Sequence, residues 1–197
     1  MTTPTESADM LEIVLVRHAE TEWSRDGRHT GHTDIPLTDA GRAAAAGLPE
    51  RLRAWRFEKV LVSPSTRARE TCRLAGFDDQ ALVREGLMEW DYGEYEGLTT
   101  REIHATRPDW YQWRDGCPGG ENAAAVGARA DAVLAELRGT KGAVAIFSHG
   151  HMLRVLGARW IRADPKFGGR LGLSTGAICL LGHEHRVAIV HGWNLLE

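Results

Sequence analysis

Three short apolar runs in this sequence stop abruptly at polar residues whose side chains could do chemistry. In chain order these residues are Arg17-His18, Ser63-Pro64 and Ser148-His149-Gly150. Each apolar run has the length and the β-branched content of a buried strand. Because ligands of open α/β sheets bind beyond the carboxyl ends of the strands, we expect the two histidines to meet at one rim of a sheet.

Two histidines and two arginines at one rim suit the transfer of a phosphoryl group. A neutral imidazole is a competent nucleophile that can carry a phosphoryl group covalently, and His18 is placed for this role. Arginine matches phosphate oxygens with a planar, permanently charged fork, which Arg17 and Arg67 can supply. A leaving alkoxide needs a proton, and Glu89 lies in an apolar stretch of chain that suits a carboxylic acid donor.

Each of these residues taken alone has an ordinary structural explanation. Arg67 would be a solvated helix residue, Glu89 a surface charge in a loop, and His149 a helix cap. Independent surface residues, however, have no reason to fall at the ends of strands. The joint arrangement therefore favours a catalytic site.

The segments that must position these residues alternate between strands and helices. Strands are expected over residues 11–16, 59–62 and 143–147, with a later hairpin that pairs 177–181 with 186–190 across the loop 182–185. Helices are expected from Thr38, from Ser63-Pro64 with the proline at the first helical position, over 99–106, 108–114 and 121–138, and after Gly150. This order predicts an α/β domain whose largely parallel sheet is covered on both faces. Residues 85–120 are expected to form a lid insert over the sheet edge.

Length and composition favour one domain with a full hydrophobic core, since the chain has 197 residues of which 43% are hydrophobic. We expect a disordered N-terminal tail at residues 1–10, which lacks the apolar run of a signal peptide, and a single domain at 11–197. The net charge of −3 and the absence of a basic run exclude nucleic acid and membrane as expected partners. Three widely spaced cysteines without a CxxC pair fit a reducing, cytoplasmic compartment.

Five segments, in order along the chain, resemble the motifs of the histidine phosphatase superfamily, also called phosphoglycerate mutase-like. They are LVRHAET at 15–21, GHTDIPLTDAG at 31–41, SPSTRARET at 63–71, EWDYGEYEG at 89–97 and SHG at 148–150. The C-terminal hairpin also looks like the closing hairpin of that family, so the resemblance spans nearly the whole chain. It implies a three-layer α/β/α sandwich and a metal-independent reaction without a cofactor.

The resemblance also implies a role for individual residues. His18 would be the nucleophile that forms a phosphohistidine, and Glu89 would be the proton donor. Arg17, Arg67 and His149 would clamp the phosphoryl group. The residues that we expect to contact the substrate in addition are Ser24, Thr30, Gly31, His32 and Gly150.

Two residues depart from the family pattern. Ala19 stands in place of the usual glycine, which matters only if the backbone there needs a positive φ. Ser24 stands where many members carry asparagine. A hydroxyl can still donate to a phosphoryl oxygen, so we expect altered selectivity and no loss of activity.

The family includes phosphatases, which hydrolyse the phosphohistidine, and phosphoglycerate mutases, which preserve it. The Trp23-Ser24 pair and the segments 89–100 and 113–121 most resemble the phosphatase branch, which includes broad acid phosphatases and sedoheptulose-1,7-bisphosphatase-like enzymes. We therefore expect a phosphoric monoester hydrolase acting on small phosphorylated metabolites, with sugar phosphates as candidates. Mutase-type phosphoryl transfer is the alternative, and a catalytically silent module that binds phosphorylated ligands is a third reading. The resemblance also allows a homodimer, although nothing in the sequence specifies an interface.

Two pairs of histidines have a spacing that raises the question of a metal site. On a strand, residues two apart share a face, which would apply to His149 with His151 or to His183 with His185. However, no carboxylate or thiol at ligand spacing completes either pair. We therefore expect no metal site.

Overall fold

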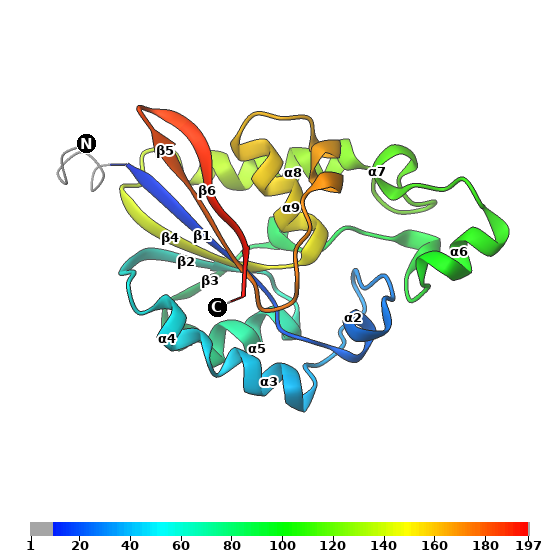
Figure 1. Cartoon of the computed structure of the whole chain (residues 1–197), viewed down its shortest axis with the longest axis horizontal. Coiled ribbons are helices and arrows are strands. Elements are labelled where there is room, and N and C mark those ends of the chain that lie inside the picture. The colour runs from blue at the N-terminus through cyan, green and yellow to red at the C-terminus, as the bar shows by residue number, and fades with distance from the viewer. Residues whose placement is uncertain (1–9, 197) are drawn as a thin grey trace.

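A mixed six-stranded sheet lies at the centre of the computed structural model, which describes residues 10–196 (Figure 1). The strands are β1 (Leu11–Arg17), β2 (Phe57–Val62), β3 (Ala81–Val83), β4 (Gly142–Ser148), β5 (Ile178–Glu184) and β6 (Val187–Leu195). Their order in the sheet is β3-β2-β4-β1-β5-β6. The first four of these in space are parallel, whereas β5 is antiparallel to both of its neighbours. The predicted disordered tail lies outside the described residues, apart from Met10.

Helices cover both faces of this sheet. They are α2 (Glu22–Asp26), α3 (Asp39–Ala45), α4 (Leu48–Leu52), α5 (Thr66–Leu74), α6 (Thr100–Thr106), α7 (Gln112–Asp115), α8 (Ala123–Glu136) and α9 (Gly150–Trp160). Short 3₁₀ turns are η1 (Asp78–Gln80), η2 (Glu85–Leu87), η3 (Gly93–Tyr95) and η4 (Pro165–Arg170). Figure 1 shows α8 and α9 on one side of the sheet and α3, α4 and α5 on the other. Within residues 10–196, none of these helices has the length and apolar character needed to cross a membrane.

The two faces of the sheet bury separate hydrophobic cores. Along β1, Ile13 and Leu15 pack into the core beneath α8 and α9, whereas Val14 and Val16 pack into the core with α3, α4 and α5. Successive side chains of a strand point to opposite faces, so a strand buried on both faces reads as one continuous apolar run. The predicted α/β class and three-layer arrangement are confirmed.

Several element boundaries differ from the predicted ones. Pro64 is not the first helical residue, because Ser65 adopts an extended backbone and caps α5 through the N–H of Ala68. The C-terminal hairpin closes through a tighter turn than the predicted loop 182–185. Its two turn residues, His185 and Arg186, both have positive φ angles, 46° and 67°, and such turns usually carry Asn or Gly. The short elements α2, α4 and β3 carry too few residues for a periodic pattern and were not predicted.

The lid insert lies beyond the carboxyl ends of β1 and β4, where Figure 1 shows α6 and α7 at the side of the molecule away from the N-terminus. Its aromatic side chains are mostly packed inside it. The buried ones are Trp90, Tyr92, Trp110 and Trp113. Trp90 and Trp113 meet edge to face with ring centroids 5.4 Å apart. Packing therefore accounts for most of these aromatics.

The start of α3 is fixed directly to the chain that leaves β1. Thr38 caps α3 by accepting the N–H of Gly41, as its position predicts, and its own N–H donates to Glu20 O at 2.9 Å. A side chain at Gly41 would overlap the carbonyl oxygen of Glu20, because the first turn of α3 lies directly on it. This contact sets the path of the loop that follows His18.

We expect Gly41→Ala to lower the free energy of unfolding by about 1–3 kcal/mol, because backbone must move to admit the methyl group. Urea denaturation of the two proteins measures this difference. Gly172→Ala is the matched control, since a Cβ there meets no atom within 4 Å and the glycine has no positive φ. Equal stability of the Gly41→Ala protein and the control would contradict the close packing of α3.

Candidate active site

The carboxyl ends of β1 and β4 bring the two predicted histidines together. The strands are parallel, with Arg17 paired to Ser148, and the N–H of His18 donates to Ser148 O at 2.9 Å. The rings of His18 and His149 meet edge to face with centroids 5.2 Å apart. The polar ends of two sheet strands thus form one buried cluster.

His18 is held as a neutral imidazole with a free Nε2. Its Nδ1 lies 2.8 Å from Ala19 O, and because a carbonyl can only accept, the ring hydrogen must be on Nδ1. Burial, followed by the charges of Arg17 and Arg67, lowers the pKa of His18 well below its ordinary value of 6.5. Ala19 is not among the described residues with positive φ, so the departure from glycine strains nothing there.

His149 is fixed in the opposite tautomer. The Nε of Arg67 donates to Nδ1 of His149 at 3.2 Å, so the ring hydrogen is on Nε2. That Nε2 lies 2.7 Å from the hydroxyl oxygen of Ser63. Burial, followed by the charge of Arg67, lowers the pKa of His149 well below its ordinary value. A rigid neutral ring therefore stands directly beside His18.

Arg67 connects this ring to the loop that follows α2. Its guanidinium is fully buried and donates to the carbonyl oxygens of Thr30, Gly31 and Thr33 at 3.2, 2.9 and 3.0 Å. These bonds and the one to His149 occupy four of its five N–H groups. In this structure Arg67 supports the wall of the pocket from behind and does not line it.

Arg17 keeps a donor unused inside the pocket. One Nη donates to Leu173 O, but its Nε is buried and has no partner among residues 10–196. A Cβ at Gly150 would lie 3.2 Å from the guanidinium carbon, so the glycine lets Arg17 rest against the first turn of α9. An unpaired buried donor beside His18 suits a phosphate oxygen.

Glu89 is buried at the N-terminus of α9. Its carboxylate oxygens accept the main-chain N–H groups of Trp90, His151 and Met152 at 2.9, 3.0 and 2.9 Å. The positive end of the helix dipole also faces this group. Only 5% of Glu89 is exposed, and the carboxyl group lines the same pocket as His18.

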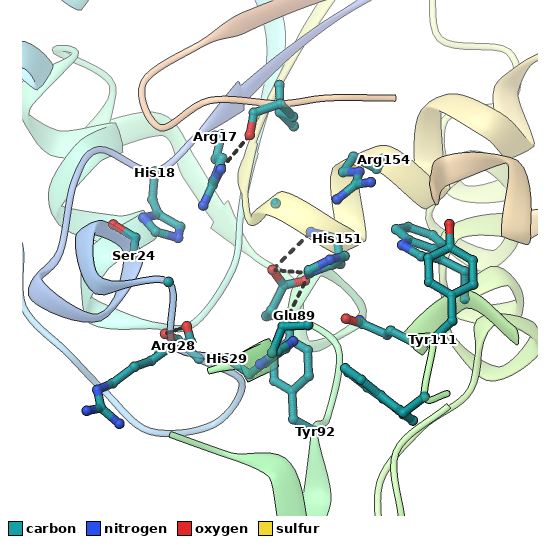
Figure 2. Close-up of a pocket in the computed structure, with 18 of the residues that line it drawn as sticks. Arg17, His18, Ser24, Arg28, His29, Glu89, Tyr92, Tyr111, His151 and Arg154 are labelled. Carbon is teal, nitrogen blue, oxygen red and sulfur yellow. Dashed lines mark hydrogen bonds and ion pairs between the residues drawn. The ribbon is translucent and has the colours of Figure 1, made fainter. Parts of the chain in front are cut away.

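The pocket has a volume of about 370 Å³ and opens over this cluster (Figure 2). The predicted site residues that line it are Arg17, His18, Ser24, Thr30, Glu89 and Gly150. His149 lies behind His18, in contact with its ring, and is fully buried. The strand ends thus deliver most of the predicted residues to one cavity.

Three predicted substrate contacts are not available in the expected way. Gly31 lies outside the lining, and its N–H is bound by the carboxylate of Glu96 at 2.9 Å. His32 is exposed and also lies outside the lining. The hydroxyl of Ser24 accepts the N–H of Thr21 and donates to its carbonyl oxygen, both at 2.9 Å. Ser24 therefore completes the cap of α2 instead of presenting a free donor to the substrate.

Several pocket residues were not predicted as site residues. They include Tyr92, Gln112, His151 and Arg154. Nδ1 of His151 lies 2.6 Å from the hydroxyl oxygen of Tyr92. The spacing of His151 from His149 indicated only a possible metal ligand. Arg154 lies one helical turn after Gly150. Residues at this four-residue spacing share one face of a helix, and this spacing could have indicated Arg154 as a pocket residue. Gln112 reaches the pocket through the fold of the lid, for which the sequence gave no signal.

Within residues 10–196, no three His, Cys, Asp or Glu side chains are grouped to hold a metal ion. His183 lies in β5, with its Nδ1 3.2 Å from Leu11 O, and His185 lies in the turn that follows.

Known proteins resemble this chain over nearly its full length. Residues 13–196 match the histidine phosphatase superfamily (branch 1). An acid phosphatase of Mycobacterium tuberculosis is 41% identical over 180 residues, which cover 89% of this chain and 88% of the relative. Sedoheptulose 1,7-bisphosphatase of Saccharomyces cerevisiae is 34% identical, with 75% of this chain and 66% of the relative covered.

A solved structure of an open reading frame product from Mycobacterium tuberculosis has the same fold. It superposes with a TM-score of 0.88 at 40% identity and covers 93% of this chain and 97% of that one. These likenesses confirm the predicted family and the predicted enzyme class, a phosphoric monoester hydrolase. The motifs, the three-layer fold and the paired histidines of this chain agree with these comparisons. The chain belongs to the histidine phosphatase superfamily.

Proposed function

We propose that this chain hydrolyses small phosphorylated metabolites, sugar phosphates among them, through a phosphohistidine on Nε2 of His18. The observation that carries the proposal is the fixed tautomer of His18. With its hydrogen on Nδ1 and held by Ala19 O, the ring offers an unprotonated Nε2 inside the pocket. Arg17, whose buried Nε has no partner among the described residues, and Glu89 line the same cavity.

In the first step Nε2 of His18 attacks phosphorus, and the bond from phosphorus to the ester oxygen breaks. The hydrogen bond from Nδ1 to Ala19 O stabilises the positive charge that develops on the ring. Arg17 neutralises charge on the phosphoryl oxygens, and no metal is needed to place them. The carboxyl group of Glu89 gives its proton to the leaving oxygen.

In the second step water replaces the histidine. Glu89, now a carboxylate, takes a proton from water while the water oxygen attacks phosphorus. The bond between phosphorus and nitrogen breaks, inorganic phosphate is released, and His18 returns to its neutral form. The three N–H groups on Glu89 keep its oxygens in one place through both steps.

We also propose that the protein works in the cytoplasm. This is supported by its three cysteines, which are all buried as separate free thiols. Burial raises the pKa of the Cys72 thiol to about 12, which disfavours its reactive thiolate form.

We expect phosphate release from small phosphate esters in EDTA, and a loss of about a thousandfold or more in His18→Ala, because the nucleophile is removed. The panel contains p-nitrophenyl phosphate, sugar mono- and bisphosphates and phosphoglycerates. His191→Ala is the matched control, since this histidine is exposed on β6 and lies outside the pocket.

Each other outcome of this panel has a distinct meaning. Activity that survives in His18→Ala would exclude His18 as the nucleophile. Interconversion of phosphoglycerates without phosphate release would identify a mutase. Binding of esters with neither phosphate release nor interconversion of phosphoglycerates would identify a silent binding module.

Ring nitrogen NMR should find His18 and His149 neutral and in opposite tautomers at pH 6. The hydrogen should be on Nδ1 in His18 and on Nε2 in His149, because their partners fix these positions. Both pKa values are lowered, so the unfolded chain takes up protons first as the pH falls below about 6.5. The stability that these rings contribute is complete above that pH and decreases on acidification.

Thermal melting between about pH 7 and pH 5 measures the second part of this prediction, and the melting temperature should fall towards pH 5. A His18 ring that takes up its proton near pH 6.5 in the spectra would contradict the account. So would a hydrogen found on its Nε2 at pH 6.

A further inference from the structure

The guanidinium group of Arg17 takes its direction from one main-chain carbonyl group. One of its Nη atoms donates to Leu173 O, the bond that Figure 2 marks at this arginine, and no other hydrogen-bond partner of the group lies among residues 10–196. Its contact with Gly150 is packing without a preferred direction, whereas a hydrogen bond is directional. The position of Leu173 O therefore decides which way the remaining donors of Arg17 face.

Leu173 lies in a segment without helix or strand structure, residues 171–177, between η4 and β5. We call this segment the Arg17 loop. Its C-terminal end is fixed to β1, because the N–H of Gly176 donates to the carbonyl oxygens of Arg17 and His18 at 3.2 and 3.1 Å. The carbonyl group of Leu173 lies outside these bonds, so another part of the chain must fix it.

The side chain of Asn194, near the end of β6, fixes that carbonyl group from its other side. Its Oδ1 accepts the N–H of Ser174 at 2.6 Å. Leu173 O and the N–H of Ser174 belong to one peptide group, which is planar and trans, so its C=O and its N–H point in opposite directions. Asn194 and Arg17 therefore hold the two sides of one rigid plane. Such a chain of hydrogen bonds also strengthens its members by mutual polarisation.

A β-bulge in β6 places Asn194 for this contact. Ile178 pairs with Leu195 and Leu180 pairs with Gly192, so one residue of β5 lies opposite two residues of β6. Asn194 has a φ of 56°, and among the described residues it is the only non-glycine residue inside a strand with a positive φ. Asparagine tolerates this left-handed conformation better than most residues. Because bulges redirect side chains, the bulge lets an amide on a sheet strand reach the Arg17 loop.

Two further contacts hold the end of β6 against the Arg17 loop. Nε1 of Trp193 donates to Gly172 O at 2.6 Å. Arg51 of α4 donates to Gly176 O at 3.0 Å and to Leu195 O at 2.8 Å, which joins the loop to the strand. Figure 1 shows the segment that leads into β5 beside the end of β6. The bulge is therefore attached to the loop on both sides of Asn194.

We propose that Asn194 is a positioning residue for Arg17. By holding the peptide group between Leu173 and Ser174, it keeps the guanidinium group turned so that its free donors meet the phosphoryl oxygens. A residue of the last strand thereby acts on the reaction at His18 without lining the pocket. This inference rests on the proposed function for the role of Arg17 in turnover, but its effect on phosphate binding can be measured separately.

The first test removes the acceptor and keeps the backbone conformation. Asn194→Gly should lower kcat/KM for p-nitrophenyl phosphate about tenfold, because a misplaced Arg17 stabilises the transferred group less. Asn194→Asp should stay within about threefold of wild type, because it keeps an acceptor and tolerates a positive φ. Val187→Gly is the matched control, since Val187 is exposed at the other end of β6 and lies outside the pocket. Thermal melting of each variant verifies that the assays are run on folded protein.

A double-mutant cycle separates positioning from a general structural effect. In an Arg17→Ala background, Asn194→Gly should lower kcat/KM no further, because the group that it orients is gone. An equal fold loss in both backgrounds would make Asn194 merely structural and would overturn the inference. So would wild-type activity of Asn194→Gly, or a loss in Asn194→Asp as large as that in Asn194→Gly.

Calorimetry with inorganic phosphate runs the same cycle without turnover. Asn194→Gly should weaken phosphate binding to the otherwise wild-type protein and should have no effect in the Arg17→Ala protein. If wild type hydrolyses no ester but this coupling is present, the proposed function fails and the role of Asn194 stands. If esters are hydrolysed through His18 but phosphate binding shows no coupling, the proposed function stands and the role of Asn194 fails.

Discussion

The hydrogen bond from the N–H of His18 to Ser148 O continues the parallel pairing of β1 and β4 beyond their last paired residues. Because the two strands end together, His18 lies next to His149, and the first residue of α9 lies against Arg17. A slip of one residue would turn each side chain to the other face of the sheet. The positions of His18, of His149 and of the start of α9 are therefore set by one strand register, which two buried hydrophobic cores hold in place.

Burial and fixed hydrogen-bond polarity determine the chemistry at this edge. Each imidazole has a partner that can act in only one sense: Ala19 O accepts from His18, and Arg67 donates to His149. Both rings are buried next to cations, which keeps them neutral. Burying a guanidinium is costly, and the three carbonyl oxygens bound by Arg67 offset that cost. The same bonds hold the loop that forms one side of the pocket.

The residues at the rim of the sheet could be predicted because they follow from local patterns. An apolar run that stops at Arg17-His18 predicts the end of a strand, and the strand does end there. The lid side of the pocket could not be predicted, since Gln112 reaches it only through the packing of the lid. His32 and Ser24 show that nearness in sequence is not enough to place a free side chain in the pocket. Both lie near His18 in sequence, but His32 is exposed and Ser24 completes a helix cap. Motif position predicted which residues gather at the pocket better than it predicted which of their neighbours have free hydrogen-bond donors.

The central claim is that phosphate is carried on Nε2 of His18 between the two steps. The most direct measurement is rapid acid-free quenching of the enzyme during turnover, followed by mass spectrometry of its peptides. The account predicts a single phosphate on the peptide that contains His18, attached at Nε2 and lost after acid treatment. Turnover without any phosphorylated peptide, or with the phosphate on another residue, would contradict it.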